Sequence, residues 1–120
     1  MNKIKLEGID IPLFISKESY ANNNTTALTI YCVEDGYIEP YIEVTTNIEE
    51  AKKHLNDVGD NAILVKTWSE NESLIEPLLK SGFFEDTGDT VYVSDWCYAS
   101  IWKVIKEISG DSEIGILEEE

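Results

Sequence analysis

The chain has 120 residues, 42% of them hydrophobic and 10% aromatic, so it is long enough and apolar enough to bury one core. Its formal net charge is -15, from 24 acidic and nine basic residues, and every basic residue is a lysine. This charge excludes easy binding to nucleic acid, and the lack of arginine removes the side chain that best grips phosphate. The natural interpretation is a positively charged partner, with solubility as the alternative reason for the acidity.

The N-terminal part predicts a first hairpin. Residues 3–6 and 9–15 are extended segments on either side of a Glu-Gly turn, and Pro12 indicates an edge position. Residues 16–26, which contain three consecutive asparagines, predict a loop.

Residues 27–33 and 37–45 predict the clearest hairpin. A three-residue turn with Gly36 in the left-handed conformation would pair Cys32 with Ile38 and place the small apolar side chains on one face. A two-residue turn would set Cys32 beside Glu39 and mix the core and solvent sides, so the sequence favours the longer turn. The outer face would then carry phenols alternating with carboxylates: Thr29, Tyr31, Tyr37, Glu39, Tyr41 and Glu43.

Residues 47–58 predict a helix. Asn47 can cap its start, Glu50 completes a capping box and Gly59 ends it. Apolar residues at helical spacing give it one buried stripe, while its lysines and acids face water.

The C-terminal half predicts two strands around a second short helix. Residues 62–67 are typical of a buried strand, and residues 90–93 of another. Between them, a helix capped at Ser73 tolerates Pro77 in its first turn and ends at Gly82.

Periodicity does not decide the structure of residues 95–108. Their apolar residues fit both helical spacing and β alternation. Residues 109–120 hold acids and few large side chains and predict a frayed acidic tail that follows a single domain of residues 1–108.

Four short motifs resemble the domain-of-unknown-function family 4313, small proteins of bacterial mobile elements and phages. They are Tyr20-Ala21-Asn22, the Gly36 turn followed by Glu39-Pro40-Tyr41, Ser69-Glu70-Asn71-Glu72 leading through Leu74 and Leu79 to Gly82, and Asp86-Thr87-Gly88. The resemblance covers most of the chain and implies an extended stretch after the Thr-Gly pair, which favours a strand over residues 95–104.

The chain departs from the family pattern at three places. Ser73 stands where the family usually has glycine, Asp89 stands where it has arginine, and residues 47–58 are a helix-rich insertion. The family brings no activity to transfer. Its setting is mobile DNA, where small acidic proteins often inhibit host defence enzymes.

No catalytic, metal or cofactor site is predicted. A Cys-His pair would need His54 to face Cys32 or Cys97, and nothing in their spacing supports it. With 24 acidic residues, some carboxylates must lie close together, so a carboxylate pair does not indicate acid-base catalysis. The acid clusters at residues 34–35 and 118–120 lack the oxygen spacing of an EF-hand. Trp68, Trp96 and Trp102 are assigned to packing.

The predicted partner-binding surface is the outer face of the second hairpin. Tyrosine is enriched at protein interfaces, and an acidic rim would suit a basic groove. The alternative is an ordinary solvated strand face. The surface comprises Tyr31, Glu34, Asp35, Tyr37, Glu39, Tyr41 and Glu43.

The expected fold is α+β, an antiparallel sheet of about five or six strands with two helices packed on one side. With no signal segment or long apolar run in the sequence, a cytoplasmic location is expected. The leading hypothesis is a non-enzymatic inhibitor of anti-CRISPR type that mimics the charge of nucleic acid on a basic protein surface. The alternative is a structural or regulatory accessory domain of a conjugative element that assembles through apolar contacts.

Overall fold

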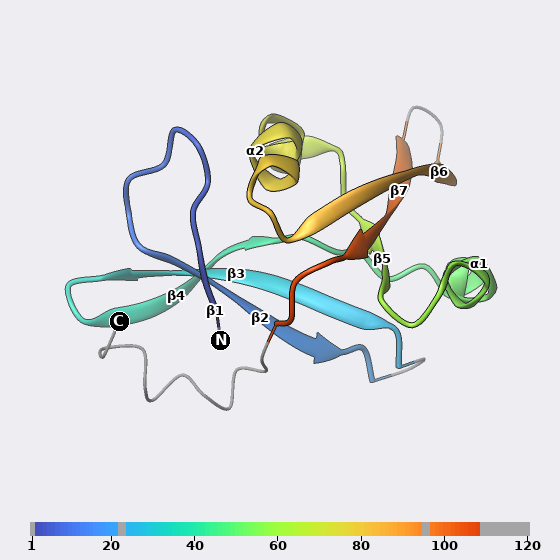
Figure 1. Cartoon of the computed structure of the whole chain (residues 1–120), viewed down its shortest axis with the longest axis horizontal. Coiled ribbons are helices and arrows are strands. Elements are labelled where there is room, and N and C mark those ends of the chain that lie inside the picture. The colour runs from blue at the N-terminus through green and yellow to red at the C-terminus, as the bar shows by residue number, and fades with distance from the viewer. Residues whose placement is uncertain (1, 22–23, 95–96, 109–120) are drawn as a thin grey trace.

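The computed structural model describes residues 2–21, 24–94 and 97–108, and these form an α+β fold (Figure 1). The strands are β1 (Asn2–Ile4), β2 (Leu13–Ser19), β3 (Thr26–Glu34), β4 (Tyr37–Glu43), β5 (Ala62–Val65), β6 (Phe84–Ser94) and β7 (Cys97–Val104). The helices are α1 (Lys52–Val58) and α2 (Ile75–Lys80), each preceded by a 3-10 helix, η1 (Glu49–Ala51) and η2 (Ser69–Leu74). No helix in the described residues is long and apolar enough to cross a membrane.

The described strands form two antiparallel sheets, so the expected single sheet of five or six strands is wrong. The first sheet has the order β1-β2-β3-β4, and the second has the order β5-β7-β6. A pattern of alternating residues marks where strands lie but not which of them pair, because pairing depends on contacts between distant parts of the chain.

The two helices pack on opposite faces of the second sheet, which corrects the expectation that both cover one side. Leu55 of α1 belongs to a cluster with Leu64 and Ile101. Leu78 of α2 belongs to a cluster with Ile63 and Trp102, whose side chains point to the other face of the same strands. In Figure 1, α1 and α2 accordingly stand apart.

Residues 44–46 join the two sheets. The Val44 N–H donates to the Leu28 carbonyl of the first sheet at 2.9 Å. On the other side, the Lys66 N–H donates to the Val44 carbonyl at 2.9 Å and the Thr46 N–H to the Leu64 carbonyl at 3.0 Å. A three-residue stretch of backbone therefore satisfies hydrogen bonds of both sheets, and we call residues 44–46 the junction.

The N-terminal hairpin formed by β1 and β2 has a longer loop than predicted, and its second strand begins and ends later in the sequence. The loop of residues 5–12 joins β1 to β2, and Pro12 lies in this loop, not in an edge strand. β2 continues to Ser19 through part of the predicted loop, and β2 lies between β1 and β3. Lys17 and Glu18 pair with Leu28 and Ala27 of β3, and this pairing explains why a segment with two charged residues still forms a strand.

Both helices begin later than their predicted caps. Helical structure starts at Glu49, so the residue at the N-cap is Ile48 and not Asn47, and Ile48 makes no side-chain cap hydrogen bond. The second α-helix begins at Ile75, not near Ser73, because the 3-10 turns of η2 precede it. Pro77 lies in its first turn, as predicted.

The ambiguous C-terminal segment is a strand over Cys97–Val104, and residues 105–108 lie outside any strand. β7 pairs with β5 on one side and β6 on the other, which confirms the extended alternative. β6 is longer than the four residues predicted. Trp96, Asn22 of the first family motif and the predicted tail of residues 109–120 lie outside the described residues.

The main core lies between the two sheets and beneath α2. Trp102 is fully buried, and its ring centroid lies 5.6 Å from that of Phe84. Ile30 of the first sheet and Ile63 of the second are buried in the same cluster. The two sheets therefore share one hydrophobic core, as expected of a single domain.

A polar pair seals the junction. The hydroxyls of Tyr20 and Thr45 form a hydrogen bond of 2.9 Å, and the Leu28 N–H donates to Thr45 Oγ1 at 3.0 Å. Burial raises the pKa of the Tyr20 hydroxyl above its usual 10.0, Thr45 lowers it by hydrogen bonding, and the charge of Glu43 raises it further. The net shift is upward, so the native state favours the neutral phenol.

We expect alkaline pH to destabilise the protein partly through Tyr20. The unfolded chain loses the phenol proton at lower pH than the native state, so this contribution is full below about pH 10 and is lost as the pH rises above it. Tyr20→Phe should cost about 1 kcal/mol near neutral pH through the lost hydrogen bond and should flatten the fall above about pH 10. Urea unfolding across this pH range, with the exposed Tyr37→Phe as control, measures both. Parallel pH curves for wild type and Tyr20→Phe would contradict the assignment.

Candidate functional site

The turn of the β3–β4 hairpin has two residues, not the three expected. Glu34 pairs with Tyr37, which leaves Asp35 and Gly36 between the strands. Both have positive φ, 52° and 83°. A turn with two such residues matches the twist of its strands, and Asp-Gly is a favoured pair for it because aspartate tolerates the left-handed region.

A β-bulge then corrects the register. Cys32 pairs with Glu39 and Tyr31 with Pro40, as a two-residue turn requires. The register shifts after Tyr31, so that Ile30 pairs with Ile42 and Tyr41 is the extra residue. The pairing of Cys32 with Glu39, for which the sequence disfavours the short turn, therefore occurs near the turn. The bulge restores apolar pairing from Ile30 onward without lengthening the turn.

The predicted stripe of phenols and carboxylates is therefore divided between the two faces of the hairpin. Tyr31 and Glu43 lie on the face away from the main core, beside Phe14 and the partly buried Val33 and Ile38. The other face continues from the core toward the turn, and its residues beyond the core are Glu34, Tyr37 and Glu39.

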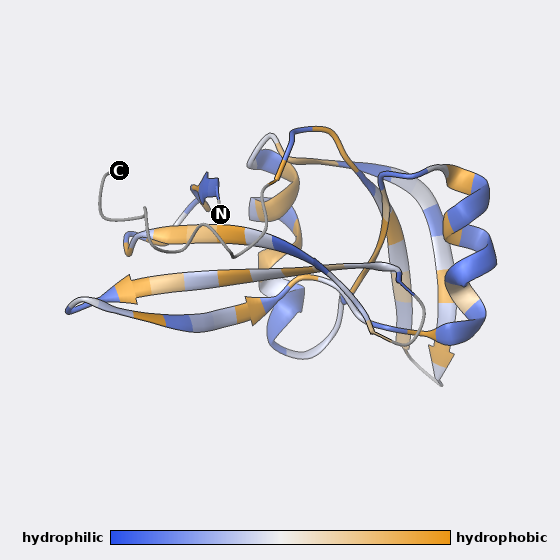
Figure 2. Ribbon diagram, turned by 90° about the horizontal axis from the view of Figure 1, so that it is seen from below, coloured by the Kyte–Doolittle hydropathy of each residue, from blue (hydrophilic) through white to orange (hydrophobic). Residues whose placement is uncertain are grey.

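The carboxylates of the hairpin are exposed and unpaired. Tyr37 is 73% exposed and Tyr41 41%, and the turn is hydrophilic (Figure 2). The ion pairs seen among the described residues join Lys66 to Glu70 and Lys80 to Glu7 and Glu76. No lysine of the described part of the chain pairs with the hairpin acids. We call these side chains the acidic hairpin: Glu34, Asp35, Tyr37, Glu39, Tyr41 and Glu43.

One anchoring residue of the hairpin was not expected. The fully buried Asn71 of η2 donates from Nδ2 to the Glu43 carbonyl at 2.6 Å, which fixes the end of β4 next to the junction. The sequence holds Asn71 within a polar motif between acids, and such a run normally indicates solvent exposure. Its burial follows from the tertiary contact alone.

The other candidates from the sequence fall elsewhere. His54 is exposed on α1, which packs on β5, whereas Cys32 is buried in the first sheet. Cys97 is partly buried, and both cysteines are free. Trp102 is in the core, and Trp68 packs against the cluster beneath α1. Within the described residues, no three histidines, cysteines or acids are grouped to hold a metal ion.

We expect Gly36→Ala to destabilise the protein by about 1–2 kcal/mol, because an L-residue pays this to adopt the left-handed conformation. A Cβ at Gly36 would meet no atom within 4 Å, so the cost is conformational and not a clash. Asp35→Asn is the matched control and should be nearly neutral, because asparagine accepts a positive φ at this position. Urea midpoints compare the two. Equal stability of Gly36→Ala and wild type would contradict the turn geometry.

Comparisons of the chain with protein-family models, curated proteins and solved structures found no match in any of the three. The resemblance to family 4313 therefore stays a prediction, and the function must be argued from the structure.

Proposed function

We propose that the protein is a non-enzymatic inhibitor that binds a basic protein surface through the acidic hairpin. The partner is a nucleic-acid-binding enzyme of host defence, and the hairpin mimics the charge of nucleic acid, as in an anti-CRISPR protein. The observation that carries this proposal is the group of four exposed carboxylates, Glu34, Asp35, Glu39 and Glu43, without a lysine partner among the described residues.

The hairpin is a suitable carrier for these charges. Backbone pairing and the Asp-Gly turn fix the backbone that carries the carboxylates, so binding has to order their side chains but not the chain itself. Glu34 and Glu39 are diagonal neighbours on one face, a relation for which separations of about 7–8 Å are typical. A basic surface built to neutralise phosphates would meet a fixed set of negative charges.

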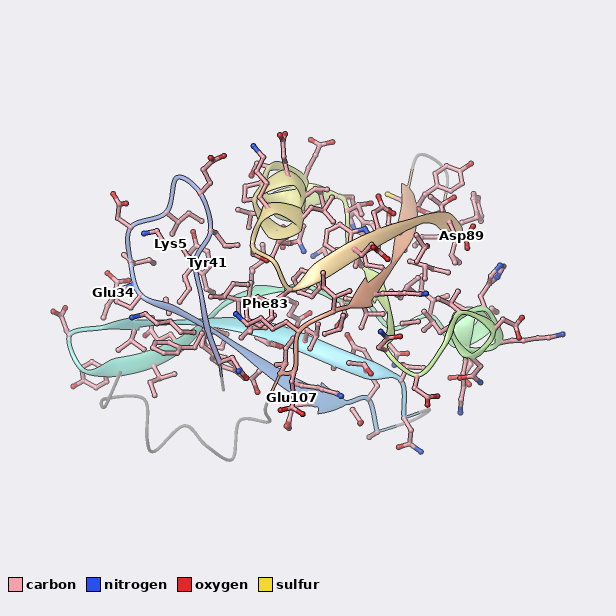
Figure 3. All side chains as sticks on the ribbon, viewed as in Figure 1. Lys5, Glu34, Tyr41, Phe83, Asp89 and Glu107 are labelled. Atoms are coloured by element: carbon pink, nitrogen blue, oxygen red, sulfur yellow. The ribbon has the colours of Figure 1, made fainter. Side chains whose placement is uncertain are left out.

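The net charge of -15 supports fast association with such a surface. Acids also occur far from the hairpin: in Figure 3, Glu34 and Asp89 lie at opposite ends of the molecule. Overall charge and the local arrangement must therefore be separated by experiment, with a control that removes the same charge elsewhere.

We expect the protein to inhibit DNA cleavage by at least one enzyme in a panel of purified bacterial defence nucleases that includes a guide-loaded Cas9-type effector. Inhibition should weaken as salt rises from about 50 mM to about 300 mM, because screening shortens the reach of the charges. The quadruple variant Glu34→Gln, Asp35→Asn, Glu39→Gln, Glu43→Gln should raise the inhibitory concentration at least about tenfold, or about 1.4 kcal/mol.

The matched control removes three glutamates and one aspartate outside the hairpin. It combines Glu50→Gln, Asp57→Asn, Glu72→Gln and Glu85→Gln, all at exposed positions. This control should inhibit like wild type. Equal loss in the two variants would mean that only overall charge matters, and a lack of inhibition across the panel at low salt would sink the proposal.

A second candidate function is supported by a different observation. On the face of the first sheet that carries Phe14, the side chains of Tyr31, Val33 and Ile38 form an apolar cluster separate from the main core. The two helices contact the other sheet, α1 through β5 and α2 through β6. An apolar sheet face of this kind suits an accessory domain that assembles with a second copy of the chain.

If this second function is correct, we expect the protein to form a dimer whose stability does not fall as salt rises. Sedimentation in about 0.5 M salt should detect a dimer, since apolar contacts persist when charges are screened. Ile38→Lys should return the protein to a monomer, while Tyr98→Lys, at an exposed position of the other sheet, should leave the dimer intact. A wild-type protein that stays monomeric at all concentrations would exclude this function.

A further inference from the structure

A hollow of about 510 Å³ lies between β1, the loop of residues 5–12 and the turn that follows α2. Its lining includes three lysines, Lys3, Lys5 and Lys106. One third of the lysines in a protein of net charge -15 thus surround a single hollow. In Figure 3, Lys5 and Phe83 mark two of the elements that border it.

These lysines are not held by neighbouring acids. Lys66 and Lys80 form ion pairs with glutamates, whereas Lys3, Lys5 and Lys106 pair with no carboxylate in the described residues. Lys106 instead lies over the Phe83 ring, with its Nζ 4.8 Å from the ring centroid. A cation over an aromatic ring keeps its other directions open for hydrogen bonds.

The hollow combines this basic rim with an apolar lining. Ile9 and Ile11 line it and are partly exposed, and the exposed Pro12 lies beside them. Ile4, Leu13 and Phe83 also line it but are nearly fully buried. One acid, Asp10, also lines it, which leaves an excess of positive charge suited to one anionic group. The volume is within the range of pockets that bind small molecules.

A second hollow of about 350 Å³ extends the same surface. It shares Lys106 with the first, and its lining adds Lys17 and the apolar side chains of Val104, Ile105 and Ile108. Asp60 and Glu107 also line this second hollow, so its lining lacks the excess of positive charge of the first. The combination of lysines with aliphatic side chains is thus repeated along the surface. A ligand with a charged head and an aliphatic body fits this combination better than a small polar anion, which would leave the apolar lining in contact with water.

We propose that the hollow around Lys106 binds an amphipathic organic carboxylate. The carboxylate accepts hydrogen bonds from the ammonium groups of Lys3, Lys5 and Lys106, and the aliphatic chain packs on Ile9, Ile11 and Pro12. Lysine suits this role because it offers compact point charges that do not require the bidentate geometry of an arginine site. At physiological salt the Debye length is about 8 Å, so the more distant acids repel such a ligand weakly while contacts in the hollow remain strong.

The test uses decanoate as the probe and the full chain as the protein. Calorimetry at about 0.15 M salt should show one site, and amide NMR shifts should concentrate at Ile4, Leu13, Phe83 and Lys106. The triple variant Lys3→Gln, Lys5→Gln, Lys106→Gln should weaken binding at least about tenfold. All three lysines are exposed, so the substitutions leave the core intact.

Two controls isolate the role of the rim. The triple variant Lys52→Gln, Lys53→Gln, Lys103→Gln removes the same charge at positions that do not line this hollow and should bind decanoate like wild type. The neutral 1-decanol should bind at least about tenfold more weakly than decanoate, because it cannot form a charge-assisted hydrogen bond. No binding of decanoate, shifts centred elsewhere, equal affinities of the two triple variants, or equal binding of decanol would each overturn the proposal. The hairpin acids play no part in this experiment, so its result is independent of the proposed function.

Discussion

The junction is the constraint on which the rest of the structure depends. Residues 44–46 give hydrogen bonds to the first sheet on one side and to the second sheet on the other, and no other segment of the described chain is seen to pair with both. Thr45 is buried there, and its hydroxyl satisfies the Leu28 N–H. Leaving the buried Leu28 N–H without an acceptor would lower the free energy of unfolding by about 1–3 kcal/mol, so the Thr45 hydroxyl contributes to the junction together with the backbone hydrogen bonds.

The two sheets share a core, and the junction bonds to both of them. Trp102 and Phe84 of the second sheet meet Ile30 of the first in one cluster. α2 closes this cluster, while α1 covers the opposite face of the second sheet. The acidic hairpin extends from the first sheet, and Asn71 anchors its end at Glu43. The charged residues are thus displayed at exposed positions of strands that also contribute Ile30 and Ile42 to the core.

Much of the fold could be predicted where the signal is local. The β3 and β4 segments, the end of α1 at Gly59 and the place of Pro77 follow from alternation, glycine and proline. The division into two sheets could not be predicted, because it depends on which distant strands meet. The acidic hairpin was identified by its residues but with the wrong register, since a bulge at Tyr41 cannot be read from a pattern that assumes regular pairing. The burial of Asn71 and the hollow around Lys106 likewise arise only when distant segments meet.

The bulge has a consequence for how the first sheet meets other proteins. β4 is an edge strand, and an open edge normally invites another strand to extend the sheet. Pro40 lacks an N–H to offer, and the adjacent extra residue, Tyr41, twists the edge away from a regular ladder. A protein that contacts this edge must therefore recognise side chains and not backbone. Recognition of that kind depends on the placement of charge more than on the secondary structure of the partner, so proteins of unrelated folds could compete for the same strand.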